Sequence, residues 1–120
     1  MTTTKWLAVC ISAALTACAL TPNEILQQGT RRTAAFQLPP AQAGACIQRN
    51  AEERSAYYIA TQRELPDKAL EVVIRLTQLL GTLAVVRLHA EGAGSAAEIW
   101  MSPNVLVDAE SLTSKFTQGC

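Results

Sequence analysis

The chain contains one histidine, and this limits the catalytic chemistry that the sequence can support. A serine hydrolase would need His89 as its general base, yet no Gly-x-Ser-x-Gly motif supplies a nucleophile. Cross-strand placement is expected to bring Glu98 beside His89 as the carboxylate of a possible pair. We expect His89 to be an exposed strand residue, and a small hydrolase built around it is the alternative.

Metal and phosphate chemistry have little support in the sequence. Zinc sites use His and Cys at short spacing, whereas the cysteines at 10, 18, 46 and 120 are dispersed. The stretch GAGS at 92–95 lacks the length and the lysine of a phosphate-binding loop, so it indicates a hairpin turn. Consecutive Glu52 and Glu53 do not share one helix face. We predict no catalytic residue, no metal site and no cofactor.

Length and charge bound the class of protein. A chain of 120 residues has room for one domain. Ten Lys plus Arg balance ten Asp plus Glu, and the basic residues form no stripe. Nucleic acid is therefore not an expected partner.

An uncharged apolar run, WLAVCISAALTA at 6–17, follows Lys5. A transmembrane helix needs about 20 apolar residues, whereas a positive residue, a short apolar segment and small residues are typical of a secretory signal peptide. A buried N-terminal helix of a cytosolic protein is the alternative, and the change to polar residues after Leu20 argues against it. We predict that residues 1–17 are a signal peptide and that the protein is exported.

The run ends in Leu15, Thr16, Ala17 and Cys18. This order resembles the lipobox of bacterial lipoproteins, in which an aliphatic residue and two small ones precede the acylated cysteine. The resemblance implies lipidation of Cys18 and membership among small proteobacterial envelope lipoproteins. Ala19 replaces the Asp of the inner-membrane retention signal, so the resemblance implies the periplasmic side of the outer membrane. Alternatives are inner-membrane anchoring and a soluble periplasmic protein cut by ordinary signal peptidase.

Two cysteines remain once Cys10 leaves with the signal and Cys18 carries lipid. In an exported chain, Cys46 and Cys120 indicate one disulfide, because the compartment is oxidising. Two free thiols or a metal pair are the alternatives. In the chain-entropy account, closing a loop of this length stabilises the fold by about 4.5 kcal/mol.

Residues 18–39 are expected to form a lipidated tether. Thr21 and Glu24 give a capping-box pattern for a short helix. The prolines and arginines of 30–45 indicate a linker, in which Phe36 can pack as a strap against the domain.

A single α+β domain is predicted for 40–120. Helical periodicity places Cys46 and Asn50 on one face of a helix, where Asn50 is expected to cap a neighbouring backbone edge. Apolar residues at spacing four indicate a second helix from about 109, with Cys120 on its apolar face. The disulfide then requires the two helices to lie side by side over one face of a sheet.

The period changes to two between these helices. Alternation at 70–76, 84–91 and 97–101 predicts three strands, and 55–65 predicts a fourth strand or a longer helix. The short loops favour an antiparallel meander of three to four strands. The fold class is therefore α+β, with the meander flanked by an N-terminal and a C-terminal helix.

Register follows from the glycine loop. We expect the loop to set His89 opposite Glu98 and Arg87 opposite Trp100, and the preceding hairpin to set Glu71 beside Arg87. Such exposed cross-strand pairs contribute little to stability.

The outer face of the meander is the candidate binding surface. A tryptophan among arginines is typical of a protein contact patch, so Arg75, Arg87, His89 and Trp100 are the candidate partner-binding residues. A face that is simply exposed, or covered by the strap, is the alternative.

The functional expectation is a non-catalytic envelope lipoprotein, attached to the membrane by its lipid and binding an envelope protein in a structural or assembly role. The alternative is a periplasmic inhibitor or immunity-type protein that neutralises a lytic or toxic enzyme.

Overall fold

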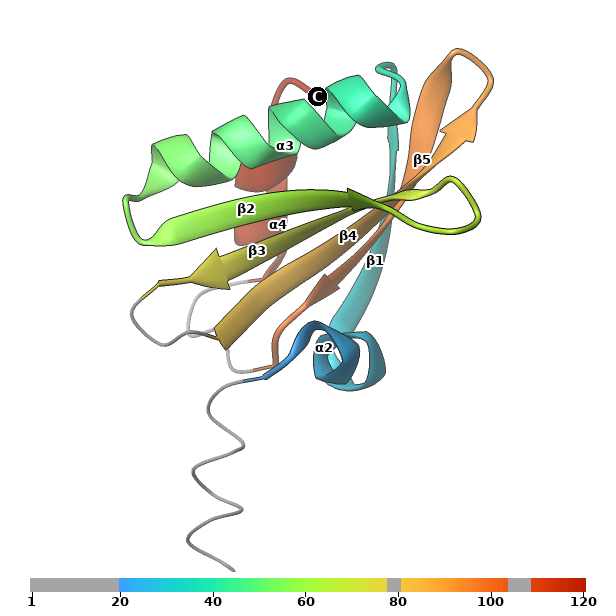
Figure 1. Ribbon diagram of the computed structural model, residues 1–120. Helices are drawn as coiled ribbons and strands as arrows, with labels where there is room; N and C mark the ends of the chain where they lie inside the picture. Colours follow the sequence, from blue (N-terminus) through green and yellow to red (C-terminus); the bar gives the residue numbers. More distant parts are fainter. Residues whose placement is uncertain (1–19, 78–80, 104–108) are drawn as a thin grey trace, which may run out of the picture.

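The computed structural model describes residues 20–77, 81–103 and 109–120. An antiparallel sheet carries helices on both of its faces (Figure 1). In chain order the elements are α2 (Pro22–Gln28), β1 (Thr30–Phe36), α3 (Pro40–Arg54), β2 (Tyr58–Glu64), β3 (Leu70–Leu76), β4 (Gly81–Glu91), β5 (Gly94–Met101) and α4 (Ala109–Thr117).

The sheet has five strands in the order β1-β5-β4-β3-β2. Strands β2 to β5 form the predicted meander, and every neighbouring pair is antiparallel. The α+β class is therefore confirmed, while the predicted number of three to four strands is too low.

The additional strand is β1, which occupies the segment predicted to be a linker. It pairs along its whole length with β5, from Thr30 opposite Met101 to Phe36 opposite Ser95. The linker interpretation is wrong here because β1 gains its stability from a partner about 65 residues away, which a local pattern cannot reveal. Phe36 packs against the core, as expected of the strap.

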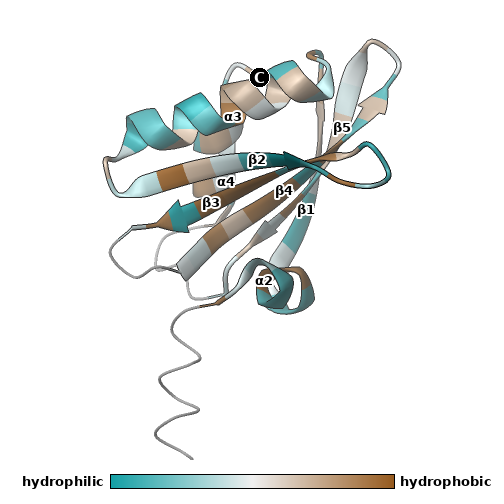
Figure 2. Ribbon diagram, in the orientation of Figure 1, coloured by the Kyte–Doolittle hydropathy of each residue, from teal (hydrophilic) through white to brown (hydrophobic). Residues whose placement is uncertain are grey.

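The hydrophobic core lies between the sheet and the helices α3 and α4 (Figure 2). Helix α3 approaches the sheet closely: a Cβ added at Gly44 would lie 2.5 Å from Leu70 Cδ2. The buried residues of this core are Ala43, Ile47, Ala51, Ala60, Val72, Ile74, Leu83, Ala84, Val86, Leu88, Ala97, Ile99, Met101, Leu112 and Phe116.

The disulfide between Cys46 and Cys120 is present, with an S–S distance of 2.08 Å. It joins α3 to the end of α4, and the two helices lie side by side, as predicted. Asn50 Nδ2 donates to the carbonyl oxygens of Phe116 at 3.0 Å and Gln118 at 2.8 Å. The prediction that Asn50 caps a neighbouring backbone edge is therefore confirmed.

Helix α2 packs against the face of the sheet opposite to α3 and α4 (Figure 1). Its capping box is formed as predicted, since the Thr21 hydroxyl accepts from the Glu24 backbone N–H at 3.3 Å. Ile25 is fully buried against Val85 and Leu20, so α2 belongs to the folded domain rather than to a tether.

The predicted signal peptide at 1–17 and Cys18 lie outside the described residues. Within the described ranges, no helix is long and apolar enough to cross a membrane.

Strands β4 and β5 are joined by a shorter turn than predicted. Glu91 lies opposite Gly94, so the turn contains two residues, and Gly92 takes a φ of +57°. Glycine is favoured at the first position of such turns because it accepts positive φ without steric cost. The predicted register is therefore wrong by two residues, which leaves each side chain on its predicted face.

Candidate functional site

The outer face is the side of the sheet that points away from α3 and α4. It carries alternate residues of all five strands, and α2 covers part of it over β4 and β5. Its principal side chains are Arg31, Ile59, Thr61, Arg63, Glu71, Val73, Arg75, Val85, Arg87, His89, Glu98 and Trp100.

A row of alternating charges crosses four neighbouring strands. Arg63, Glu71, Arg87 and Glu98 lie opposite one another on β2, β3, β4 and β5. Glu71 accepts from Arg63 Nε at 2.8 Å and from Arg87 Nε at 3.0 Å. The predicted Glu71–Arg87 pairing is confirmed, but Glu71 is only 1% exposed, so its expected exposure is wrong.

Glu98 forms a second cluster at the end of this row. Arg31 of β1 donates to it at 2.8 Å from Nε and at 2.6 Å from Nη2. His89 lies opposite Ala96 rather than Glu98, and its Nε2 is 4.0 Å from the nearer Glu98 oxygen. This separation is too long for a hydrogen bond, so His89 and Glu98 are not hydrogen-bonded to each other.

Trp100 is half-buried because it packs against the apolar cluster beneath α2. Its cross-strand neighbour is Val85, not Arg87 as predicted. The Arg87 guanidinium still lies over the indole ring, 5.9 Å from its centroid, as a diagonal neighbour. Helix α2 and Arg87 therefore restrict a partner's access to Trp100.

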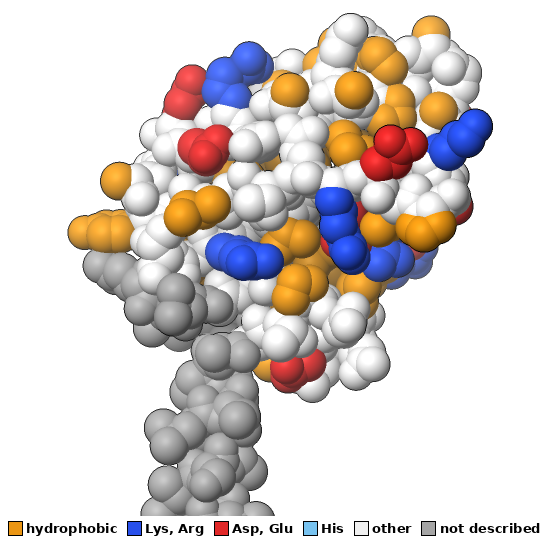
Figure 3. Space-filling view, in the orientation of Figure 1, with side chains coloured by type: hydrophobic (Ala, Val, Ile, Leu, Met, Phe, Trp, Pro, Cys, Tyr) orange, Lys and Arg blue, Asp and Glu red, His pale blue; other side chains and the backbone are white. Residues whose placement is uncertain are grey.

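The open part of the outer face lies over β2 and β3 (Figure 3). Arg75 is exposed and lies opposite Ile59, which is 44% exposed. Tyr57, just before β2, is also exposed. Among the residues that the structure describes, no carboxylate lies within ion-pair distance of Arg75. This region combines exposed apolar side chains with a cation that has no carboxylate partner in the described part of the chain.

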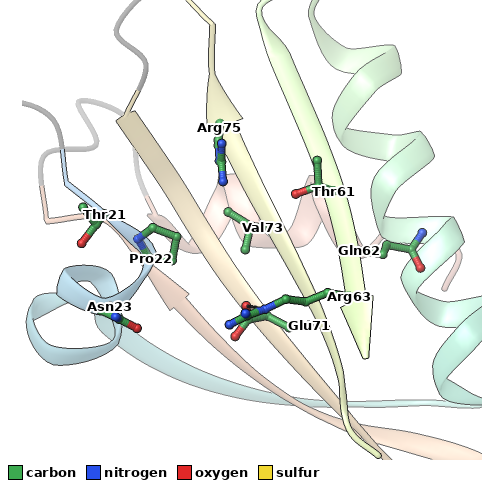
Figure 4. A pocket seen from close by; sticks show the side chains of 9 residues that line it. All are labelled: Thr21, Pro22, Asn23, Thr61, Gln62, Arg63, Glu71, Val73 and Arg75. Atoms are coloured by element: carbon green, nitrogen blue, oxygen red, sulfur yellow. Dashed lines mark hydrogen bonds and ion pairs between the residues drawn. The ribbon is translucent and has the colours of Figure 1, made fainter. Parts of the chain in front are cut away.

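A groove of about 270 Å³ separates the start of α2 from this open region. Its floor and far wall come from β2 and β3, and its near wall from the first residues of α2 (Figure 4). The lining residues are Thr21, Pro22, Asn23, Thr61, Gln62, Arg63, Glu71, Val73 and Arg75. Since Glu71 is already neutralised by two arginines, the remaining charge in the groove is positive.

The four predicted partner-binding residues share the outer face but do not form one patch. Arg87 and Trp100 contact each other, His89 lies near Glu98, and Arg75 stands with the residues of β2. Sequence reasoning missed Ile59 and Arg63, although their alternation in the segment 55–65 could have placed them on this face.

Metal chemistry has no visible centre in the described part of the chain. No group of three or more His, Cys, Asp and Glu side chains is gathered there. Cys46 and Cys120 are bound to each other.

Comparison of the chain with protein-family models, with curated proteins and with solved structures gives no match.

Proposed function

We propose that this protein is a non-catalytic envelope lipoprotein that binds a protein partner through the open part of its outer face. In this proposal, lipid on Cys18 attaches the chain to the periplasmic side of the outer membrane. The N-terminal motif supports the attachment, and the outer face supports the binding role.

The observation that carries the binding role is the pairing of exposed Ile59 with exposed Arg75 on a sheet face outside the main core. Apolar side chains beside arginine are characteristic of the centres of protein interfaces. Helices α3 and α4 already bury the opposite face, so these residues are not needed for the main core.

Neighbouring side chains are fixed before any partner arrives. Glu71 holds Arg63 and Arg87 by their Nε atoms, and Arg87 also lies over Trp100. Side chains that are already ordered lose less entropy on binding, which favours association.

A crosslinking pull-down from envelopes, using the intact lipoprotein, tests this proposal. Arg75→Glu reverses the charge of Arg75, whereas Arg49→Glu makes the same change on an exposed position of α3, away from the outer face. We expect wild type and Arg49→Glu to recover the same envelope protein, and Arg75→Glu to lose it. Equal recovery by all three proteins would exclude this face as the binding surface.

A further inference from the structure

In the part of the chain that the structure describes, β1 and β2 form the two edges of the sheet. On β2, the Tyr57 carbonyl accepts from the Thr77 N–H of the β3 side. Because antiparallel pairing alternates, the odd-numbered residues of β2 bond to β3, and the even-numbered ones direct their backbone groups outwards. The hydrogen bond from Gln48 Nε2 to the Ala60 carbonyl, at 2.9 Å, agrees with this alternation.

The outward N–H groups of β2 have few partners. The Tyr58 N–H bonds to the Ser55 carbonyl at 3.2 Å. No hydrogen bond within the described ranges accounts for the outward N–H groups of Ala60, Gln62 and Glu64. Gln48 occupies the Ala60 carbonyl, so these N–H groups are the open part of the edge, and unpaired backbone groups at a sheet edge are a template for another strand.

We propose that β2 receives an extended, acidic segment of the partner protein as an additional strand of the sheet. This inference rests on the proposed function and specifies its binding mode. Backbone hydrogen bonds would supply affinity, and side chains beside the edge would select the segment.

Charge distinguishes β2 from the other edge. On β1, Arg31 is bound to Glu98 and Arg32 lies 3.8 Å from Glu110. Near β2, Arg75 has no carboxylate partner among the described residues, and Arg63 is 65% exposed with its Nη atoms outside the Glu71 hydrogen bond. The positive potential available to a ligand therefore lies beside β2.

The groove fixes the face on which the acidic side chains must lie. Arg63 and Arg75 both line it, with Asn23 on its opposite wall. A strand added to β2 would direct alternate side chains to the outer face, where a carboxylate would lie beside Arg63 of β2 and one strand further from Arg75 of β3.

On the inner side, the new strand would meet the side chains of Gln48 and Gln62, which hydrogen-bond to each other. Amides can donate and accept, so these positions do not select for charge. The expected ligand is therefore acidic at alternate positions only.

The binding mode is tested by NMR titration of the ¹⁵N-labelled full chain in detergent micelles. The probe is a synthetic peptide of alternating glutamate and β-branched residues, and the matched control carries lysine at each glutamate. We expect the acidic peptide to shift the amide signals of Ala60, Gln62 and Glu64. The lysine peptide should bind at least about tenfold more weakly. Arg75→Glu should reverse this preference.

Two variants separate backbone pairing from side-chain contact. Gln62→Pro removes an outward N–H, which an edge strand tolerates, while Gln62→Ala loses the same side chain and keeps the N–H. We expect Gln62→Pro to lose the acidic peptide and Gln62→Ala to keep it, with unchanged signals from β4 and β5 in both. The proposal would be overturned if both peptides bound equally, if the shifts were confined to β1, or if neither peptide bound at millimolar concentration. Broadening of the β2 signals by self-association would also overturn it.

The two proposals fail in different ways in the envelope pull-down. A partner that is lost from Arg75→Glu but retained by Gln62→Pro leaves the outer face as the binding surface and excludes strand addition. A partner retained by both variants excludes the outer face itself.

Discussion

Glu71 of β3 accepts a hydrogen bond from Arg87 of β4 at 3.0 Å, although the Glu71 carboxylate is almost completely buried. Burying a carboxylate is costly unless it is paired and hydrogen-bonded. Arg63 provides the second hydrogen bond from β2, so one buried acid connects three strands. This arrangement gives the outer face a fixed polar centre between the part covered by α2 and the open part over β2.

Replacing Glu71 by Gln should reduce the free energy of unfolding by about 1–3 kcal/mol, because the amide keeps the volume but leaves two arginines without their counter-charge. Urea denaturation measures the change. Glu98→Gln is the matched control in the same row. Glu98 is 33% exposed, so its replacement should cost less than about 1 kcal/mol. If Glu71→Gln and Glu98→Gln lost the same free energy of unfolding, burial of Glu71 would add nothing to the strength of its interactions.

Local pattern was sufficient for the meander and the two core helices, and the number of remaining cysteines was sufficient for the disulfide. Alternation of apolar residues placed Val72 and Val86 inward, and the same periodicity placed Cys46 on the buried face of α3. The strands of the meander and the two helices are encoded in residues close together in the chain, and the two cysteines then fixed how the helices lie. For this reason the α+β class followed from the sequence.

Three features could not be predicted from the local sequence pattern. Strand β1 depends on β5, and the packing of the predicted helix α2 depends on the apolar outer surface around Val85, so both need distant partners. The burial of Glu71 depends on the arginines of two other strands. The position of the binding surface changed for the same reason, because α2 covers part of Trp100 and leaves Arg75 open.

Removing the disulfide should destabilise the domain strongly. The bond closes a loop with a sequence separation of 74, and in the chain-entropy account the double variant Cys46→Ala, Cys120→Ala loses about 4.5 kcal/mol. Urea denaturation of the variant and of reduced wild type should give similar midpoints. If reduced wild type stayed as stable as the oxidised protein, the bond would not constrain the unfolded chain as supposed.

Asn50→Ala should weaken the end of α4. The substitution removes the part-buried hydrogen bond to the Phe116 carbonyl and the exposed one to the Gln118 carbonyl, which should cost about 1 kcal/mol. Relative to wild type, Asn50→Ala should increase the rate of amide hydrogen exchange in α4 more than in β4. Arg49→Ala, an exposed neighbour on α3, is the control and should leave α4 protected. Protection of α4 that is equal in both variants would contradict this role.

Ile25→Ala tests whether α2 belongs to the folded domain. Ile25 is fully buried against Val85, so its truncation should cost about 2–5 kcal/mol and expose the neighbouring Trp100. Thermal denaturation measures the first effect, and a red shift of the Trp100 emission measures the second. The exposed Gln27→Ala is the control on the same helix. An unchanged melting temperature and emission for Ile25→Ala would restore the tether interpretation of this segment.

Intact mass measurement of the membrane-extracted chain tests the lipid anchor. We expect a mature chain that begins at Cys18 and carries several acyl chains, because a single chain gives only marginal membrane attachment. Cys18→Ala should abolish the acylated species and release the protein from the membrane fraction. Cys10→Ala is the matched control: that residue lies within the segment expected to be removed, so the mature mass should not change. A mature chain of the mass of its amino acids alone would show that the protein works without the lipid.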